Sequence, residues 1–458
     1  MSRHWIAVLC TVLAAVTLAG CGSGSVPSLS QNPVTPSIAA PHGEAFGGQQ
    51  PVVGMSLQLY APGSTGYGSA ATAVFSAPIM TNSDGDFSFP PGWTCPAGNP
   101  EVYLVGTGGD PVAGDTGGSA NPNLALMVAL GLCGNLNAST HIHMNELTTV
   151  AAVWALAPFM SGSTQSYLNL GTSSTNNAGL QLAFEAANEV ANISNGTFPG
   201  ALPAGATLPT TMLNTLADVL EGCINSTGGT AGQGNSCGQL FEDAPSGSAH
   251  PTDTITAALN IAQNPARNVT ALFDLVSATP AFEPNLSVAP SAWTVAIEYT
   301  GGGLSAPTAI AADQSGNIWA ANGGSNSVSE FDNAGNAKSG PSGITVGNIN
   351  TPKGVAIDLS GNAWITNSGN NTITGLNSAG GLVGTPLSGN GLNQPTGIAI
   401  DANGNIWATN AASGANSVSA FTSAGGTLDG SAFTGAGIAS PAGIAINGSA
   451  DANCADCY

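Results

Sequence analysis

The last third of the chain repeats one short pattern four times, and this repeat constrains the fold more than any other feature of the sequence. The pattern begins with Pro, continues with small and apolar residues, and ends in Asp or Asn. The four copies are APTAIAAD (306–313), TPKGVAID (351–358), QPTGIAID (394–401) and SPAGIAIN (440–447). Their prolines stand 45, 43 and 46 residues apart. A repeat of this length predicts a series of similar units, each holding several short strands.

The first three copies also continue in the same way. Gly-Asn follows, then a Trp six residues after the Asp, an Asn three residues after the Trp, and a short strand. The tryptophans are Trp319, Trp364 and Trp407, and the asparagines are Asn322, Asn367 and Asn410. Pro suits the start of a strand and Asp-x-x-Gly-Asn a tight reversal, while each Trp can wedge against a neighbouring unit. We therefore predict β-propeller blades over residues 293–447.

This block resembles the NHL-repeat propellers and, more loosely, the streptogramin-lyase-like and gluconolactonase-like propellers. The resemblance implies an architecture but no catalytic residue. Lyases of the streptogramin type use His and Glu, and lactonases use a metal cluster of Glu, Asp and Asn. The block contains no His, and its only glutamates are Glu298 and Glu330. We select the three repeat asparagines Asn322, Asn367 and Asn410 as positions for ligand contact, with turn capping as the alternative.

The number of units is low for a closed propeller. Three complete units and one further first strand fall short of the typical minimum of four blades. After Asn447 the next residues should read Gly-Asn-x-Trp, but residues 448–458 read GSADANCADCY. We expect an aberrant tail here, from a truncated or frame-disrupted end. The alternative is an incomplete propeller that closes by oligomerisation, because an open arc leaves a strand edge unpaired.

The N-terminus carries an export signal. Arg3 precedes an apolar stretch over residues 5–18, which has the length of a signal h-region, so we assign residues 1–20 to a signal peptide. Leu18-Ala19-Gly20-Cys21 resembles a bacterial lipobox. The resemblance implies cleavage before Cys21 and acylation of that residue, which would anchor the chain to the membrane. An ordinary secretory signal is the alternative.

Residues 21–50 are rich in Gly, Ser and Pro and are predicted to be a flexible tether. We therefore expect a cell-envelope lipoprotein on the periplasmic or outer-surface side of a membrane. Besides Cys10 and Cys21, six cysteines remain: Cys95, Cys133, Cys223, Cys237, Cys454 and Cys457. Proximity in sequence suggests disulfides Cys95–Cys133 and Cys223–Cys237, although four cysteines allow three pairings.

Residues 51–140 alternate short strands with turns. We predict strands at 53–60, 72–79 and 101–107, and a turn at 82–86 before Phe87-Ser88-Phe89. The block resembles β-sandwiches of the carboxypeptidase-regulatory or prealbumin-like type. Asp84 and Asp86 could bind calcium, but a hairpin turn is favoured because further oxygen ligands at fixed offsets are missing.

Residues 141–290 have helical periodicity. Helices are predicted over 146–159, 180–193, 253–262 and 269–276, and around a Leu213, Leu216 and Leu220 stripe after Pro209. The fold class is therefore multidomain: a β-sandwich-like domain, an α-helical middle region and an incomplete β-propeller.

One group of residues in this region has the composition of a metal site. His141 and His143 share one face of a strand, and Glu146 could complete the site. The favoured alternative is that Asn145 caps a helix opened by Glu146. We predict no metal and no other cofactor.

The charge composition restricts the kinds of partner that the chain could bind. The chain has 4 basic against 25 acidic residues, which excludes nucleic acid as a partner because phosphate neutralisation requires Lys and Arg. We expect the propeller repeats to act as a binding or scaffolding module for a carbohydrate, peptide or protein partner. The alternatives are a propeller-class enzyme, either a streptogramin-type lyase or a lactone hydrolase, and a purely structural envelope protein.

Overall fold

The computed structural model describes residues 40–111 and 120–446. The predicted signal peptide, the predicted acylation site Cys21, most of the predicted tether, Cys454, Cys457 and the tail at 448–458 lie outside these residues. Within the described ranges, no helix has the length and apolar character needed to cross a membrane.

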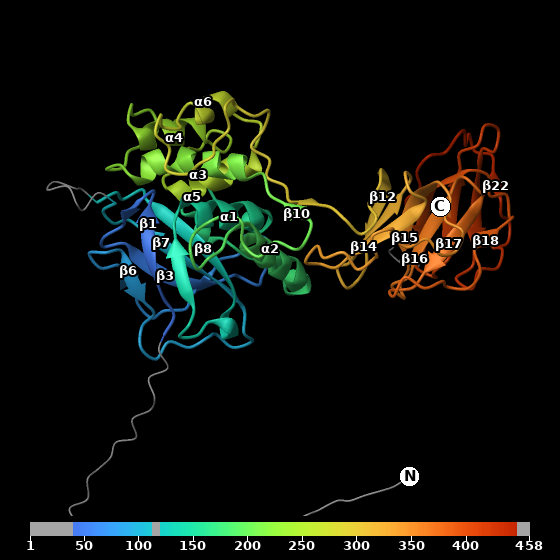
Figure 1. Ribbon diagram of the computed structural model, residues 1–458, viewed down its shortest axis with the longest axis horizontal. Helices are drawn as coiled ribbons and strands as arrows, with labels where there is room; N and C mark the ends of the chain where they lie inside the picture. Colours follow the sequence, from blue (N-terminus) through green and yellow to red (C-terminus); the bar gives the residue numbers. More distant parts are fainter. Residues whose placement is uncertain (1–39, 112–119, 447–458) are drawn as a thin grey trace, which may run out of the picture. The chain divides into compact units, whose positions relative to one another are not determined.

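The N-terminal part of the described chain contains two small sheets (Figure 1). In the first sheet, β1 (His42–Gly47) pairs antiparallel with β2 (Gln50–Pro51) and β6 (Asp86–Ser88), and parallel with β9 (His141–Met144). The second sheet is antiparallel and consists of β3 (Ser56–Ala61), β4 (Thr72–Ala73), β5 (Ile79–Met80), β7 (Glu101–Thr107) and β8 (Ala125–Leu132). Strand β1 lies in the range predicted as a tether, and β8 was not predicted.

The predicted strand at 101–107 is confirmed as β7, but a continuous strand over 72–79 is wrong. Only the two-residue strands β4 and β5 form at the ends of this range. Between them, the Gln58 side chain donates to the Phe75 carbonyl at 3.2 Å and accepts from the Phe75 amide at 3.1 Å. A side chain of β3 thus replaces the ladder bonds that would have continued the strand.

Helices follow in the order that the periodicity predicts. They are α1 (Glu146–Leu156), α2 (Asn177–Val190), α3 (Thr210–Ile224), α4 (Ser236–Asp243), α5 (Thr254–Gln263) and α6 (Val269–Phe273). Helix α4 was not predicted. The predicted cap of α1 is confirmed, because the Asn145 side chain accepts from the Thr148 amide while the Thr148 hydroxyl bonds the Asn145 amide in return.

These strands and helices share one hydrophobic core. Its buried residues extend from Ala45 in β1 to Trp293, after the last helix. Helix α1 packs on the edge strand β8 (Figure 1). There the Ala125 amide donates to the Thr254 hydroxyl at 2.9 Å and the Met127 amide to the Thr149 hydroxyl at 3.0 Å. Helix side chains therefore satisfy backbone donors of the edge strand, and residues 51–140 and 141–290 contribute to the same core.

Both predicted disulfides are present. Cys95 bonds Cys133, and Cys223 near the end of α3 bonds Cys237 in α4. Two such bonds are typical of an extracytoplasmic protein.

The repeats form three small antiparallel sheets in series. A short pair, β10 (Ala206–Thr207) with β11 (Glu298–Tyr299), precedes them in the chain. The first repeat sheet is β12 (Pro307–Ala312), β13 (Ile318–Asn322) and β14 (Ser327–Phe331). The second is β15 (Pro352–Ile357), β16 (Ala363–Asn367), β17 (Thr372–Leu376) and β18 (Leu387–Ser388).

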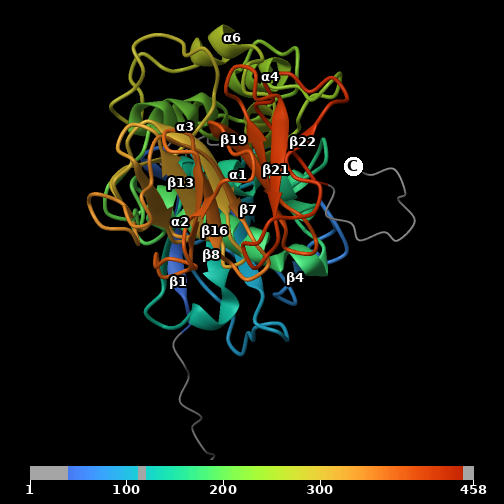
Figure 2. The same cartoon turned by 90° about the vertical axis from the view of Figure 1, so that its right-hand side faces the viewer.

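The third repeat sheet is β19 (Pro395–Ile400), β20 (Ile406–Asn410), β21 (Ser417–Phe421) and β22 (Phe433–Thr434). Strands β21 and β22 of this sheet are labelled in Figure 2. Residues 441–446, the fourth copy of the pattern, form no strand within the described chain.

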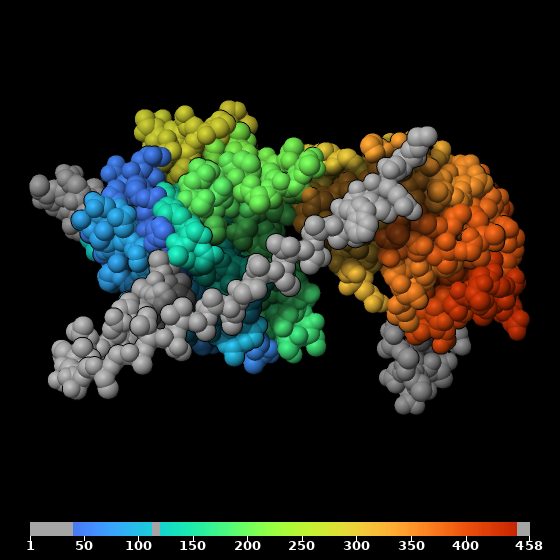
Figure 3. All heavy atoms as spheres, turned by 60° about the horizontal axis from the view of Figure 1, so that its bottom comes forward, coloured from blue at the N-terminus to red at the C-terminus, as the bar shows by residue number. Residues whose placement is uncertain are grey.

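Each repeat sheet has two distinct faces. The trailing face carries the repeat Trp, and in the first and second sheets it packs against the following sheet. The leading face is the opposite one, and in the second and third sheets it packs against the preceding sheet. Between the first and second sheets, Trp319, Ala321 and Val328 meet Val355, Ala363, Ile365 and Leu376. Between the second and third, Trp364 and Ile373 meet Ile406, Ala408 and Phe421. The three sheets therefore pack through equivalent apolar interfaces. Figure 3 shows the outer surface of this part of the chain in orange to red.

Candidate binding groove

The first strands of the repeat sheets border a groove. Strand β15 lies between β12 and β19, in contact with both, and residues 442–444 continue the series. The groove has a volume of about 490 Å³. Its lining includes Thr308, Lys353, Gly354, Thr396, Gly397 and Gly443. Four equivalent segments of the repeat thus contribute to one concave surface.

Glycine at one position of the repeat permits this close approach. A Cβ on Gly354 would lie 2.4 Å from the Thr396 carbonyl oxygen, and one on Gly397 would lie 2.9 Å from the Ala442 carbonyl oxygen. Both distances are shorter than an ordinary van der Waals contact. The absence of a side chain therefore lets neighbouring first strands run close together beside the groove.

Threonine hydroxyls connect neighbouring repeat sheets, from β12 to β15 and from β16 to β19. The Thr308 hydroxyl donates to the Pro352 carbonyl at 2.8 Å, and the Thr366 hydroxyl donates to the Thr396 carbonyl at 2.7 Å. The repeat alignment places Lys353 at the position held by Thr308 and Thr396 in the neighbouring copies. Lys353 is exposed, and it is the one charged side chain among the described residues that line the groove.

The repeat aspartates form the turn after each first strand. In the second sheet, Asp358 accepts from the Trp364 indole at 2.9 Å, the Asn362 side-chain amide at 2.9 Å, and the backbone amides of Ser360 and Asn362 at 2.8 and 2.9 Å. Asp313 and Asp401 make the same set of bonds in the other two sheets. Partial burial favours a raised pKa, but these bonds to the carboxylate outweigh it and lower the pKa of all three.

The three asparagines selected for ligand contact are fully buried, at 0% exposure. Asn367 accepts from the Asn350 amide at 3.3 Å and donates to the Thr372 and Thr374 hydroxyls at 3.1 and 2.8 Å. Asn322 and Asn410 make the corresponding bonds in their own sheets. Their amides thus join the loop before each sheet to its third strand. Ligand contact at these positions stays a prediction.

The three side chains that could have formed a metal site, His141, His143 and Glu146, each have another hydrogen-bond partner. The His143 Nδ1 lies 2.7 Å from a Glu44 carboxylate oxygen, and the His141 Nδ1 lies 2.8 Å from the Ser194 carbonyl. Glu146 is fully buried and accepts from the Gly48 amide at 2.8 Å. Burial raises the pKa of Glu146 to about 8, and the nearby Glu221 and Asp218 add to the rise. Among the described residues, no group of three or more His, Cys, Asp or Glu side chains could hold a metal ion.

The region considered for calcium is a hydrogen-bonded turn. The Asn82 side-chain oxygen accepts from the amides of Asp84 and Asp86 at 2.8 and 2.9 Å. These bonds make an Asx turn before β6, as the favoured alternative predicted.

Sequence reasoning missed the groove and Lys353. The signal was the replacement of Thr by Lys in the second copy of the pattern. Its meaning depends on which strands are neighbours, and a sequence repeat alone does not give their arrangement in space.

Comparisons with known proteins find partial structural similarity. A streptogramin B lyase is 24% identical with a TM-score of 0.25, over 31% of this chain and 45% of the lyase. The virginiamycin B lyase of Staphylococcus aureus is 22% identical with a TM-score of 0.24, over 27% of this chain and 40% of that enzyme. A protein of unknown function from Bacteroides caccae is 19% identical with a TM-score of 0.24, over 33% of this chain and 53% of that protein.

The chain spans less than half the length of these two lyases, and no activity follows from similarity at this level. No family model matches the chain, so the resemblance to NHL repeats stays a prediction. No curated protein matches it.

Proposed function

We propose that this chain is a lipid-anchored protein of the bacterial cell envelope whose repeat sheets are propeller blades that bind a carbohydrate or peptide. In this proposal Cys21 carries the anchor and residues 40–293 form the membrane-proximal part. The groove along the first strands is the ligand site.

The groove is the observation that carries the binding function. Its walls combine glycines, alanines and threonines with the apolar side chains of Val355, Ile398 and Ile444, and its charged group is Lys353. The other two lysine and arginine side chains of the described chain have partners, because Lys338 pairs with Glu330 and Arg267 donates to the Pro245 and Gly247 carbonyls. Lys353 is therefore the group best placed to pair with a carboxylate of an acidic sugar or peptide.

Binding is tested with uronate-containing oligosaccharides and acidic peptides, each compared with a neutral counterpart. We expect Lys353→Gln to lower the affinity for the acidic ligands about tenfold, which corresponds to the loss of about 1.4 kcal/mol. Lys338→Gln is the matched control and should leave the affinity unchanged. Binding that is equally strong in the Lys353→Gln variant contradicts the proposal, as does the lack of binding to every acidic ligand tested.

The anchor has a separate test. Labelling with a fatty-acid analogue in a bacterial host should modify the wild-type chain and leave Cys21→Ser unmodified. The variant should also be released from the membrane fraction. Fatty-acid labelling of the Cys21→Ser variant would exclude the anchor at this position.

The alternative function is a lyase or lactone hydrolase of the propeller class. General acid–base catalysis requires a titratable group within reach of the substrate, and within the described lining of the groove Lys353 is the one charged side chain. Turnover of a lactone substrate by the wild-type chain that disappears in Lys353→Gln would favour this alternative over binding alone.

A further inference from the structure

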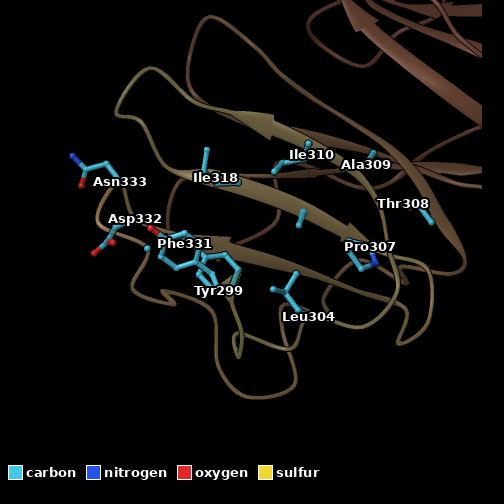
Figure 4. Close-up of a pocket in the computed structure, with 12 residues that line it drawn as sticks. Tyr299, Leu304, Pro307, Thr308, Ala309, Ile310, Ile318, Phe331, Asp332 and Asn333 are labelled. Atoms are coloured by element: carbon cyan, nitrogen blue, oxygen red, sulfur yellow. The ribbon is translucent and has the colours of Figure 1, made fainter. Parts of the chain in front are cut away.

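The first repeat sheet borders an apolar pocket of about 630 Å³ (Figure 4). Its walls include Ile318, Phe331 and Ile310, which is 70% exposed. The carboxylate of Asp332, which also borders the pocket, accepts from the Asn336 amide at 2.8 Å within its own turn. Imidazole nitrogens that are free to bind a ligand lie elsewhere, on the sheet that contains β1 and β9.

Three of the chain's five histidines lie on one face of this sheet. Strands β1 and β9 pair in parallel, with His42 opposite His141 and Glu44 opposite His143. Buried residues alternate with less buried ones along both strands, so these four side chains share the less buried face. The parallel pairing therefore brings His42, which is far away in the sequence, directly beside His141.

The rings of His42 and His141 are close enough to share one metal ion. Their centroids are 5.4 Å apart, and the ring planes are inclined by 78°. Two imidazoles that bind one ion through nitrogens at about 2.0 Å have centroids about 5 Å apart. A small rotation of the side chains would therefore bring both rings onto a shared ion.

A hydrogen bond fixes which nitrogen of His141 is free. Its Nδ1 lies 2.8 Å from the Ser194 carbonyl, and a carbonyl can only accept, so Nδ1 carries the hydrogen. The lone pair of the neutral ring is then on Nε2, and a histidine that binds a metal ion usually donates its other N–H in this way. Within residues 40–111 and 120–446, Nε2 of His141 has no hydrogen-bond partner, and the exposed imidazole of His42 has none.

His143 is held in a different position. Its Nδ1 lies 2.7 Å from a Glu44 carboxylate oxygen, and its ring stacks on Phe46 with centroids 5.3 Å apart. A Cβ on Gly196 would lie 2.1 Å from its Cδ2, so the ring is packed between neighbouring groups. The Glu44 carboxylate follows His42 by two residues on the same face, where its negative charge favours a bound cation.

We propose that His42 and His141 bind a divalent transition-metal ion through Nε2 of His141 and one ring nitrogen of His42, with water completing the coordination. Imidazole suits copper, zinc and nickel, and Cu²⁺ should bind most tightly of the three. The site has two protein ligands and so differs from the clusters of three or more considered above. It would join β1 to β9 and is independent of the groove in the repeat sheets.

The test titrates the full chain with Cu²⁺ by calorimetry, after thiols outside the disulfides have been alkylated. His42→Asn and His141→Asn should each lower the affinity at least about tenfold. The double variant should be about as weak as either single variant, because each removes the same chelate. His250→Asn is the matched control, since the His250 Nδ1 also lies near a carbonyl, that of Phe241, at 3.0 Å.

Two further measurements identify the ligands. The electron paramagnetic resonance spectrum of bound Cu²⁺ should show coupling to two imidazole nitrogens in the wild-type chain and to fewer in His42→Asn, whose fold should be retained because His42 is exposed. In the wild-type chain, Zn²⁺ should protect His42 and His141 from modification by diethyl pyrocarbonate and leave His250 reactive.

Three results would each overturn the proposal. They are a wild-type chain that binds no Cu²⁺, an affinity that is unchanged in His42→Asn, and Zn²⁺ that leaves His42 and His141 as reactive as in its absence.

Discussion

At the scale of single residues, the repeat aspartates connect two features of each repeat sheet, its first turn and its repeat Trp. One carboxylate bonds the backbone of its own turn and the indole of the repeat Trp, whose ring packs between sheets. The carboxylate therefore links the local turn to the interface with the next sheet, which explains why both residues recur at a fixed spacing.

Asp358→Asn should destabilise the chain by about 1–3 kcal/mol, because an amide cannot accept from all four donors and Trp364 is buried. Urea unfolding measures the change. The exposed Asp429 provides the control, and Asp429→Asn should stay close to wild type. Equal losses in the two variants would argue against the bonding role of Asp358.

A variant at Asn367 distinguishes a structural role of the repeat asparagines from the predicted ligand contact. Asn367→Ala should lower the free energy of unfolding by about 1–3 kcal/mol, because it leaves buried donors and acceptors unpaired. Asn403→Ala, at an exposed turn position, should have little effect. Weaker ligand binding by Asn367→Ala at unchanged stability would instead support the ligand contact predicted from the sequence.

At the scale of secondary-structure elements, crosslinks and close contacts hold neighbouring segments together. The disulfide between Cys223 and Cys237 joins α3 to α4 and closes a loop with a sequence separation of 14. Replacing both cysteines with Ser should lower the free energy of unfolding by about 3 kcal/mol. Reducing agent should destabilise the wild-type chain more than this variant, which retains only Cys95–Cys133 among the described disulfides. An equal response would contradict the stabilising role of the bond.

The close approach of β15 and β19 predicts intolerance to side chains at Gly354. Gly354→Ala should destabilise the chain by about 1–3 kcal/mol, because its Cβ would meet the Thr396 backbone. Gly340→Ala is the matched control, since a Cβ there meets no atom within 4 Å. Thermal unfolding of both variants gives the comparison, and a Gly354→Ala variant as stable as Gly340→Ala would refute the packing argument.

At the scale of the whole molecule, the chain has few basic residues that could form ion pairs with its carboxyl groups. Some carboxylates are stabilised by hydrogen bonds instead, and other carboxyl groups are buried. Burial raises the pKa of Glu101 to about 7, of Glu146 to about 8 and of Asp218 to about 6. Such groups hold protons in the folded state that the unfolded chain releases. Their stabilising effect is therefore present at low pH and is lost as the pH rises through these values. The repeat aspartates act in the opposite direction, because their lowered pKa values favour folding until the pH falls below about 4.

The free energy of unfolding should therefore fall between about pH 5 and about pH 8, with each buried carboxyl contributing up to about 1.4 kcal/mol per pH unit. Chemical unfolding at a series of pH values measures this slope. Glu146→Gln should reduce the slope, whereas Glu298→Gln, at an exposed position, should not. Stability that increases over this range would show that the buried carboxyls do not govern the pH dependence.

The sequence predicted local structure well at positions where the residue type strongly favours one local conformation or one hydrogen bond. The Pro, Asp, Gly-Asn and Trp of each repeat place the turns and strands, and Asn145 places the start of α1. Strand β1 and helix α4 were missed. Gly43 in β1 is needed because a Cβ would lie 1.8 Å from the Ile142 carbonyl oxygen, and this contact involves a residue far away in the sequence.

The sequence by itself determined the repeat and the fixed spacing of its turns and tryptophans, and it suggested the two disulfides between nearby cysteines that the structure contains. These depend on interactions between residues close together in the chain. The tertiary structure alone decided that the early strands and the helices share one core, that the repeat asparagines are buried, and that Lys353 borders a groove with an apolar face exposed on the first sheet. Those properties depend on which distant segments become neighbours, and the same local pattern is compatible with several such arrangements.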